Sequence, residues 1–112
     1  MLLALSDGCC PRIDNYQDGS KLPGSYVILA EKVNGNCHYM LQGDNVPPFG
    51  IWMCGDSWWI GVLSDKGECK GILQASTDSK PNVHVQDNSL QWKHVSSGDN
   101  RDLNFNCVDL CL

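Results

Sequence analysis

The sequence predicts a small all-β domain stabilised by disulfides, an antiparallel meander that forms a barrel or a two-layer sandwich. Short runs of β-forming residues alternate with Gly, Pro, Asn and Asp turns along most of the chain. No segment sustains the apolar period of about 3.6 residues of an amphipathic helix, so we expect no helix longer than about two turns. Seven cysteines in 112 residues are typical of a domain that folds in an oxidising compartment.

The length is that of one ordinary domain, and the 42% hydrophobic content is enough to build a core. We expect residues 1–8 to be an N-terminal tail or the remnant of a signal peptide, because Met1–Ser6 is an apolar stub without a basic leader. Residues 9–112 are expected to form a single disulfide-rich β domain.

The first hairpin has the strongest local signals. Ser25–Lys32 is rich in β-formers and is followed by Asn34-Gly35, so Cys37–Gln42 is expected to return beside it. The residues before Tyr26 form a polar, turn-rich lead-in, which we interpret as an extended arm attached to the sheet by its cysteines.

Later strands follow a loop, Gly43–Gly50, whose Pro47-Pro48 pair cannot lie inside a sheet. Gly55-Asp56-Ser57 indicates a second tight hairpin, and Asp87-Asn88-Ser89 a third. The expected strands are Ile51–Cys54, Trp58–Leu63, Cys69–Ala75, Val83–Gln86, Leu90–Val95 and Leu103–Val108.

The odd number of cysteines predicts three disulfides and one cysteine left over. Cys9 and Cys10 are neighbours that could bridge each other only with severe strain, so each should pair elsewhere. A bridge from either of them to Cys107 or Cys111 would join the two ends of the domain. In the chain-entropy model such a bridge removes about 4.7 kcal/mol of unfolded-state freedom.

In the middle of the chain, Cys37 and Cys54 fall at the same end of a predicted ladder, so we expect a disulfide between them. Cys69 is then the partner of a terminal cysteine or the spare. An exposed spare cysteine would lead to covalent dimers.

The charge pattern bears on partners and cofactors. The net charge of −5 and the scattered basic residues disfavour nucleic acid and acidic membrane surfaces. No apolar run reaches the ~20 residues of a membrane helix, so no membrane insertion is expected. Among the cysteines, only Cys107 and Cys111 approach the spacing of zinc ligands. Asp99–Asp102 resembles half of a calcium-binding loop, but Arg101 within it argues against calcium. We therefore expect no metal and no cofactor.

Three histidines admit an enzymatic interpretation, in which His84, His94 and Lys93 perform acid–base chemistry of the ribonuclease kind. Strand parity instead places His84 and His94 at outward, solvated positions, and the same interpretation applies to His38. The sequence has no GxSxG, HExxH or glycine-rich phosphate motif. We therefore predict that the domain is not an enzyme.

The segment Ile51–Gly61 carries three tryptophans within eight residues, on two strands of one hairpin. Trp58 and Trp59 are consecutive and point to opposite faces of a strand, so one is exposed unless the sheet is covered on both sides. A sugar can stack on an exposed tryptophan. Polar groups of the nearby loop would then bind the hydroxyls of that sugar. The candidate ligand-binding residues are Trp52, Trp58, Trp59, Asp44 and Asn45. The other interpretation, which we favour, is that both rings are packed in a two-layer fold.

A series of short motifs runs along the chain from about residue 10 to residue 107. They are Ile13, Gly24-Ser25-Tyr26-Val27, Val33-Asn34-Gly35, Tyr39, Ile51-Trp52, Trp59-Ile60-Gly61, Gly71, Pro81 and Leu90-Gln91-Trp92. Their order resembles a small β-module of secreted and surface proteins of invertebrates and some algae. The resemblance implies an extracellular binding, adhesion or structural role and carries over no catalytic residues. The extra cysteines and the doubled Trp58-Trp59 depart from the module's pattern.

These observations lead us to expect a non-enzymatic, secreted recognition or adhesion module, lectin-like where an exposed tryptophan binds glycan. Its partner would be a protein or a glycan at an extracellular surface. A stand-alone secreted effector, such as a toxin or an inhibitor, is the alternative that small size and dense cysteines also fit. A small secreted hydrolase that uses the histidines is the third interpretation.

Overall fold

The computed structural model describes residues 9–15, 24–43, 47–79, 83–87, 89–101 and 103–108. Within them, nine strands form one antiparallel sheet in the order β8-β7-β6-β5-β4-β3-β2-β1-β9. The strands are β1 (Arg12–Asn15), β2 (Gly24–Val33), β3 (Asn36–Leu41), β4 (Phe49–Cys54), β5 (Ser57–Val62), β6 (Leu73–Ser76), β7 (Trp92–His94), β8 (Asn100–Arg101) and β9 (Asn106–Val108). The one helical element in these ranges is a short 3-10 turn, η2 (Leu63–Asp65). The all-β prediction is confirmed, and the architecture is a curled sheet, a half-barrel.

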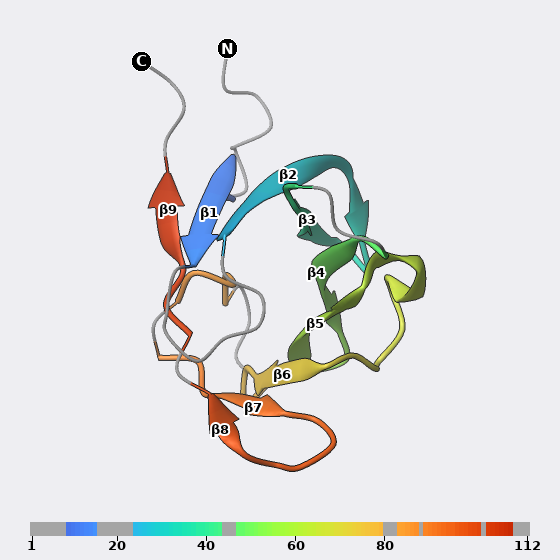
Figure 1. Cartoon of the computed structure of the whole chain (residues 1–112), viewed down its shortest axis with the longest axis vertical. Helices are drawn as coiled ribbons and strands as arrows, with labels where there is room; N and C mark the ends of the chain where they lie inside the picture. The colour runs from blue at the N-terminus through green and yellow to red at the C-terminus, as the bar shows by residue number, and fades with distance from the viewer. Residues whose placement is uncertain are drawn as a thin grey trace.

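Figure 1 shows the sheet curled around a central space, with β2 arching over it. The bend in β2 has a cause in its register with β3. Ile28 pairs with Tyr39 and Lys32 pairs with Cys37, so four steps along β2 match only two along β3. The two extra residues form a bulge, which bends the strand and increases its twist.

The β2–β3 hairpin forms where the sequence predicts it. Asn34 and Gly35 occupy the turn with φ of 53° and 81°. Two consecutive positive φ angles are the requirement of the tight hairpin turn that matches strand twist, and Asn-Gly is the pair that best tolerates them.

The two edges of the sheet, β8 and β9, are consecutive in the chain, and residues 103–105 lie between them on the open side of the half-barrel. Phe105 is 3% exposed there, and its ring lies 5.8 Å from that of Tyr26 and 5.8 Å from that of Trp92. Both contacts are edge-to-face, an arrangement that aromatic pairs favour. One phenylalanine thus connects β2 with β7 across the gap.

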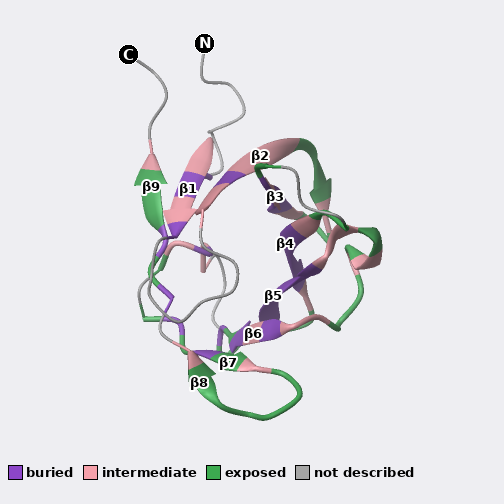
Figure 2. Cartoon of the chain, in the orientation of Figure 1, coloured by how far each residue is buried: buried purple, intermediate pink, exposed green. Residues whose placement is uncertain are grey.

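The core fills the inside of the curl, where each long strand contributes every second residue. Figure 2 shows the buried residues concentrated on β3, β4 and β5. The inward residues include Ile13, Tyr26, Tyr39, Leu41, Ile51, Met53, Trp58, Ile60, Leu73, Ala75, Val85 and Trp92.

Three strand predictions need correction. Val83–Gln86 is not a strand but part of a turn-rich segment, in which the Asp87 N–H donates to the His84 carbonyl. The segment is not a strand because the neighbour of β6 in the sheet is β7. The segment lies instead at the end of the half-barrel, where Val85 is buried in the core. The segment expected from Cys69 becomes a strand only at Leu73, because the chain first passes over the outer face. The expected Leu103–Val108 strand is reduced to β9.

The arm before Tyr26 contains a strand of its own, β1, which pairs with both β2 and β9. Two disulfides also attach it to the sheet, as the sequence predicts. They are Cys9–Cys37 and Cys10–Cys107. The second joins the two ends of the domain, which confirms that prediction, whereas Cys111 lies outside the described residues.

The expected Cys37–Cys54 disulfide is wrong, and strand parity explains why. Cys37 shares the inward face of β3 with Tyr39, and its register position on β4 is Met53. Cys54 is one residue further and therefore points to the outer face. It forms a disulfide with Cys69, which is neither the spare nor the partner of a terminal cysteine.

Candidate functional site

All three tryptophans of the predicted site are buried, which agrees with the interpretation that both Trp58 and Trp59 are packed and not with an exposed ring. Trp52 is 0%, Trp58 2% and Trp59 8% exposed. The side chains of Trp58 and Trp59 do point to opposite faces, but the sheet is covered on both. Asp44 and Asn45 lie outside the described residues.

The outer face has a cover of its own. Residues 63–71, which we call the strap, leave the sheet after β5 and return to it before β6. The indole N–H of Trp52 donates to the carbonyl of Glu68 in the strap at 2.7 Å. Trp59 is the direct cross-strand neighbour of Trp52, and its N–H donates to the Cys54 carbonyl at 3.1 Å.

Two glycines provide room for this cover. Gly50 and Gly61 face each other across β4 and β5, each two residues from a tryptophan of the pair. A Cβ at Gly61 would lie 2.9 Å from the Gly71 Cα and 3.2 Å from the Trp52 ring. A Cβ at Gly50 would collide with the Leu63 side chain. The Gly-x-Trp and Trp-x-Gly patterns therefore create the space in which the strap packs.

Several contacts hold the strap in place. The Cys54–Cys69 disulfide attaches it to the end of β4. The Asn34 side-chain amide donates to the carbonyls of Met53 and Gly67, at 2.8 and 3.1 Å. Lys66 Nζ lies 2.7 Å from Glu31 Oε1, and this hydrogen bond and charge lower the pKa of Glu31.

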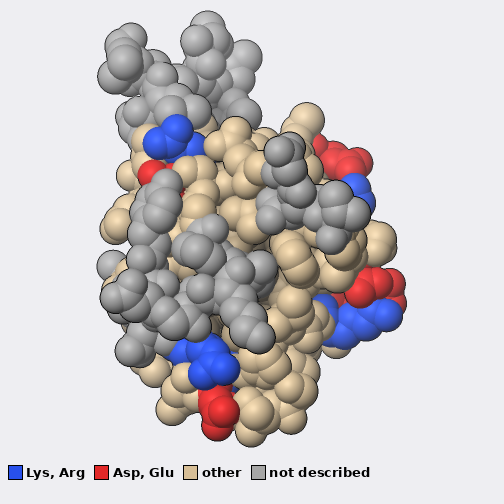
Figure 3. All heavy atoms as spheres, viewed as in Figure 1, with Lys and Arg blue, Asp and Glu red and all other residues tan. Residues whose placement is uncertain are grey.

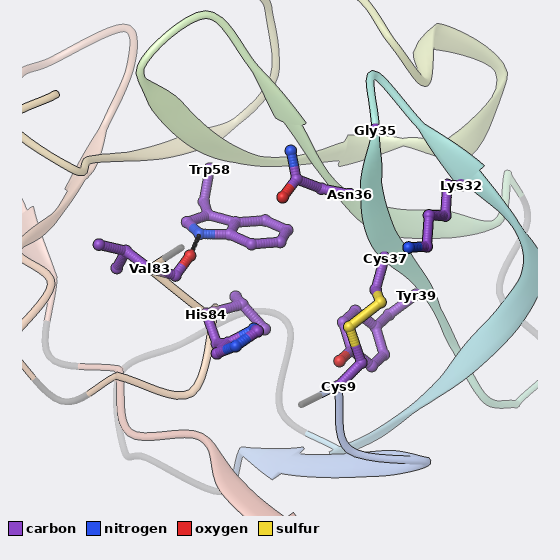
Figure 4. A pocket seen from close by; sticks show the side chains of 10 residues that line it. Cys9, Lys32, Gly35, Asn36, Cys37, Tyr39, Trp58, Val83 and His84 are labelled. Carbon is purple, nitrogen blue, oxygen red and sulfur yellow. Dashed lines mark hydrogen bonds between the residues drawn. A yellow bond between two sulfur atoms is a disulfide. The ribbon is translucent and has the colours of Figure 1, made fainter. Parts of the chain in front are cut away.

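Trp58 lies on the other side of the sheet, in the wall of a cavity of about 250 Å³ at the end of the half-barrel. Its lining residues come from the arm, the first hairpin, β5 and the turn-rich segment after β6. They are Cys9, Lys32, Gly35, Asn36, Cys37, Tyr39, Trp58, Val83, His84 and Val85. Figure 4 shows Trp58 and His84 on one side of this cavity, and the Cys9–Cys37 disulfide with Tyr39 on the other. We call it the Trp58 pocket.

Hydrogen bonds decide which groups of the Trp58 pocket face a ligand. The Trp58 N–H already donates to the Val83 carbonyl at 2.9 Å, so this donor is occupied within the domain. The Asn36 amide N–H donates to the Asn34 carbonyl at 3.2 Å, which leaves its side-chain oxygen as an acceptor. Within the described part of the chain, neither ring nitrogen of His84 has a hydrogen-bond partner.

The lining residues of the pocket differ in burial: the aromatic ones are buried, and the polar ones are half-buried or exposed. Trp58 and Tyr39 are 2% and 1% exposed, so almost no part of either ring is open to the cavity. His84 and Asn36 are half-buried and Lys32 is exposed. Burial raises the pKa of Tyr39 to about 12, so its phenol stays neutral and can hydrogen-bond without charge.

None of the ten lining residues carries a carboxylate, and the ionisable nitrogens among them belong to Lys32 and His84. The charged side chains among these ten residues are therefore basic, whereas the whole chain has a net charge of −5. Elsewhere opposite charges lie close together, as in the pairs Arg12–Asp14 and Lys66–Glu31. On the face shown in Figure 3, the basic and acidic side chains form small mixed groups.

The histidines do not share one environment. His84 lines the Trp58 pocket, whereas His94 lies on β7, where its Nδ1 is 2.9 Å from the Ser96 hydroxyl. His38 is 0% exposed, so its predicted solvated position is wrong: it is on the outer face, but that face is covered there. Burial lowers the pKa of His38, opposed by the bond between its Nδ1 and the Glu31 carbonyl.

Within the described ranges, no three His, Cys, Asp or Glu side chains gather as a potential metal site. The same ranges contain no helix that has the length and apolar character to cross a bilayer. No family model, no curated protein and no solved structure matches this chain. The resemblance to the invertebrate and algal β-module therefore stays a prediction.

Of the ligand-binding residues predicted from the sequence, Trp58 lines the pocket; His84 was considered only for acid–base chemistry, and Asn36 was missed. Asn36 follows the Asn34-Gly35 turn, and this position at a hairpin end was the available signal. Strand parity predicted a solvated position for His84, whereas the tertiary structure places it in the lining of the pocket.

Proposed function

We propose that this domain is a non-enzymatic extracellular recognition module that binds a single sugar residue of a glycan in the Trp58 pocket. The observation that carries the proposal is a cavity that combines the nearly buried rings of Trp58 and Tyr39 with the half-buried side chains of His84 and Asn36. Sugars present apolar C–H faces and a rim of hydroxyls, which aromatic rings and amide or imidazole groups bind.

The size of the pocket supports a small ligand group. At about 250 Å³ the cavity is smaller than the typical pocket of a drug-sized ligand, about 300–1,000 Å³. One sugar ring is a suitable occupant, and the rest of a glycan chain would leave through the open mouth. A single site of this kind binds weakly, so biological use would require several copies of the domain or of the glycan.

The construction of the pocket supports a preformed site. Cys9–Cys37 lies in its wall and joins the arm to β3, so the cavity is held between two parts of the chain that are 28 residues apart. A preformed site loses less free energy in ordering when it binds. Three disulfides are also typical of proteins from oxidising compartments, which supports an extracellular setting.

The test is a glycan array probed with the disulfide-bonded domain and with two variants. Asn36→Trp places an indole at the pocket and should abolish glycan binding. Gln91→Trp adds the same bulk at an exposed position outside the pocket and should leave binding unchanged. Circular dichroism and thermal melting establish that both variants are folded.

Glycans recovered after incubation should keep their mass, because the proposed module binds without cleaving. An array on which the wild-type domain retains no glycan would overturn the proposal and favour adhesion through protein partners. Equal glycan binding by Asn36→Trp and the wild type would also contradict it, since the ligand would then lie elsewhere. Cleaved glycans would favour the hydrolase interpretation.

A further inference from the structure

The side chain of Asn34, at the exposed turn of the first hairpin, is held by two hydrogen bonds. Its amide nitrogen donates to the Met53 carbonyl near the end of β4 at 2.8 Å, and to the Gly67 carbonyl of the strap at 3.1 Å. An amide NH₂ has two donors, which these two acceptors match. One turn residue therefore joins the first hairpin to the second hairpin and to the strap.

Asn34 is also followed by Gly35, the one Asn-Gly pair in the sequence, and such a pair is open to an intramolecular reaction. The glycine backbone nitrogen attacks the side-chain amide carbon, and the new C–N bond closes a succinimide ring. The bond to the amide nitrogen breaks, and ammonia leaves with the proton that the backbone nitrogen gives up. Water then opens the ring at either carbonyl, which leaves aspartate or isoaspartate. Glycine favours the attack because no Cβ shields its nitrogen.

The surroundings of the turn allow this reaction, but the hydrogen bonds of the amide oppose it. Gly35 lies at the end of the hairpin (Figure 4), and a Cβ there would have nothing within 4 Å. Asn34 and Gly35 are both exposed to water. The amide nitrogen, however, must take up a proton and leave, and it is held between two carbonyls.

From this geometry we infer that Asn34 is a site of spontaneous deamidation and that the strap controls the rate. The inference is independent of the proposed glycan recognition. Deamidation of a folded protein proceeds from the fraction of molecules in which the amide has left its partners, and a hydrogen bond lowers that fraction. The bond to Gly67 exists only while the strap is in place.

The reaction would loosen the strap in turn. Its product is a carboxylate, which only accepts hydrogen bonds and would face the carbonyl oxygens of Met53 and Gly67. The strap would keep its disulfide and the Lys66–Glu31 ion pair but lose the bond to the turn. Because the strap covers Trp52, this ring should become more accessible to water. Strap attachment and deamidation thus oppose each other, and each affects the other through the same bond.

The decisive experiment measures the rate of conversion at Asn34 by peptide mapping and mass spectrometry, after incubation at mildly alkaline pH. Cys54→Ser with Cys69→Ser releases the strap and should raise the rate about 3- to 10-fold, the factor that one hydrogen bond is worth. Cys10→Ser with Cys107→Ser removes a disulfide outside the strap and should keep the slow rate. Circular dichroism establishes that the variants are folded. The reduced chain unfolded in urea has lost both bonds and should react about 10- to 100-fold faster than the folded wild type.

A second pair of variants tests the strap without touching a disulfide. Lys66→Gln removes the ion pair with Glu31 on β2 and should raise the rate by a smaller factor, about twofold. Lys70→Gln is the matched control, because Lys70 pairs only within the strap, with Asp65 and Glu68, and the rate should stay that of the wild type.

Asn34→Asp reproduces one product of the reaction and tests the loosening of the strap. It should lower the midpoint of thermal unfolding and shift tryptophan emission to longer wavelength. Asn106→Asp makes the same change at an exposed position on β9 and should leave the emission unchanged.

The results that would overturn the inference are specific. Equal rates in the folded wild type and the unfolded chain would show that the hydrogen bonds give no protection. Equal rates in the wild type and in both strap-loosening variants would remove the control by the strap. Wild-type emission and stability in Asn34→Asp would contradict the loosening, and an Asn34 that stays intact even in the unfolded chain would not be a deamidation site. An empty glycan array would overturn the proposed function but leave these rates as they are.

Discussion

The indole N–H of Trp52 donates to the carbonyl of Glu68 at 2.7 Å, which connects the outer face of the sheet with the strap. This bond explains how a tryptophan on the outside of a half-barrel reaches 0% exposure. The strap that supplies the carbonyl is attached by a disulfide, by the Asn34 amide and by an ion pair. Its attachment gives the first prediction.

Replacing both Cys54 and Cys69 by Ser should lower the free energy of unfolding by about 3 kcal/mol, because the bridge closes a loop of about 15 residues. Release of the strap should also expose Trp52 and shift its fluorescence to longer wavelength. Urea unfolding followed by tryptophan emission measures both effects. The matched control, Cys10→Ser with Cys107→Ser, opens a loop of 97 residues and should cost more, about 4.7 kcal/mol. An unchanged unfolding midpoint in the first variant would contradict the role given to this disulfide.

Gly61→Ala should destabilise the domain by about 1–3 kcal/mol, the usual cost of forcing extra volume into a packed site. The new Cβ would lie 2.9 Å from the Gly71 Cα and 3.2 Å from the Trp52 ring, so the strap would have to move. Thermal unfolding gives the measurement. Ser64→Ala, at an exposed position in the strap, is the control and should change stability by less than about 0.5 kcal/mol. Equal stability of the two variants would show that the strap is not closely packed.

Phe105→Ala should cost about 3–5 kcal/mol, because it removes a buried ring that contacts Tyr26 and Trp92. The effect should be accompanied by loss of near-ultraviolet circular dichroism from these aromatic side chains. Phe105→Leu keeps most of the apolar volume and should cost clearly less than the alanine variant. If both variants unfold at the wild-type temperature, Phe105 does not close the half-barrel.

Acid should destabilise the domain through His38. Burial lowers the pKa of His38 below its unfolded value of about 6.5, so the unfolded chain binds a proton more readily. The stability that neutral His38 contributes is therefore complete above that pH and is lost as the pH falls through the lower folded pKa. His38→Gln should show a smaller loss of stability between about pH 7 and pH 5 than the wild type. Urea unfolding across this range is the measurement, and His94→Gln, which should retain the wild-type slope, is the control.

Local patterns by themselves determined a large part of this fold. Alternating β-formers and turn residues specify an antiparallel β domain because strand and turn preferences act between neighbours in the chain. For the same reason Asn34-Gly35 predicted the β2–β3 turn, and strand geometry alone placed Trp58 and Trp59 on opposite faces. A disulfide between the two ends of the domain also followed from the sequence, because the adjacent Cys9 and Cys10 had to pair at a distance, but the choice of Cys10 and Cys107 did not.

Only the tertiary structure decided what covers each face and which cysteines meet in the middle of the chain. Cys54 pairs with Cys69 because the strap folds back over the outer face, and no local pattern describes that path. The same path buries Trp52, one of the candidate ligand-binding residues that the sequence predicted. The Trp58 pocket depends in turn on His84 being brought opposite Cys9, 75 residues away in the chain. Contacts between such distant residues follow from the packing of the whole sheet, which periodicity and turn signals do not encode.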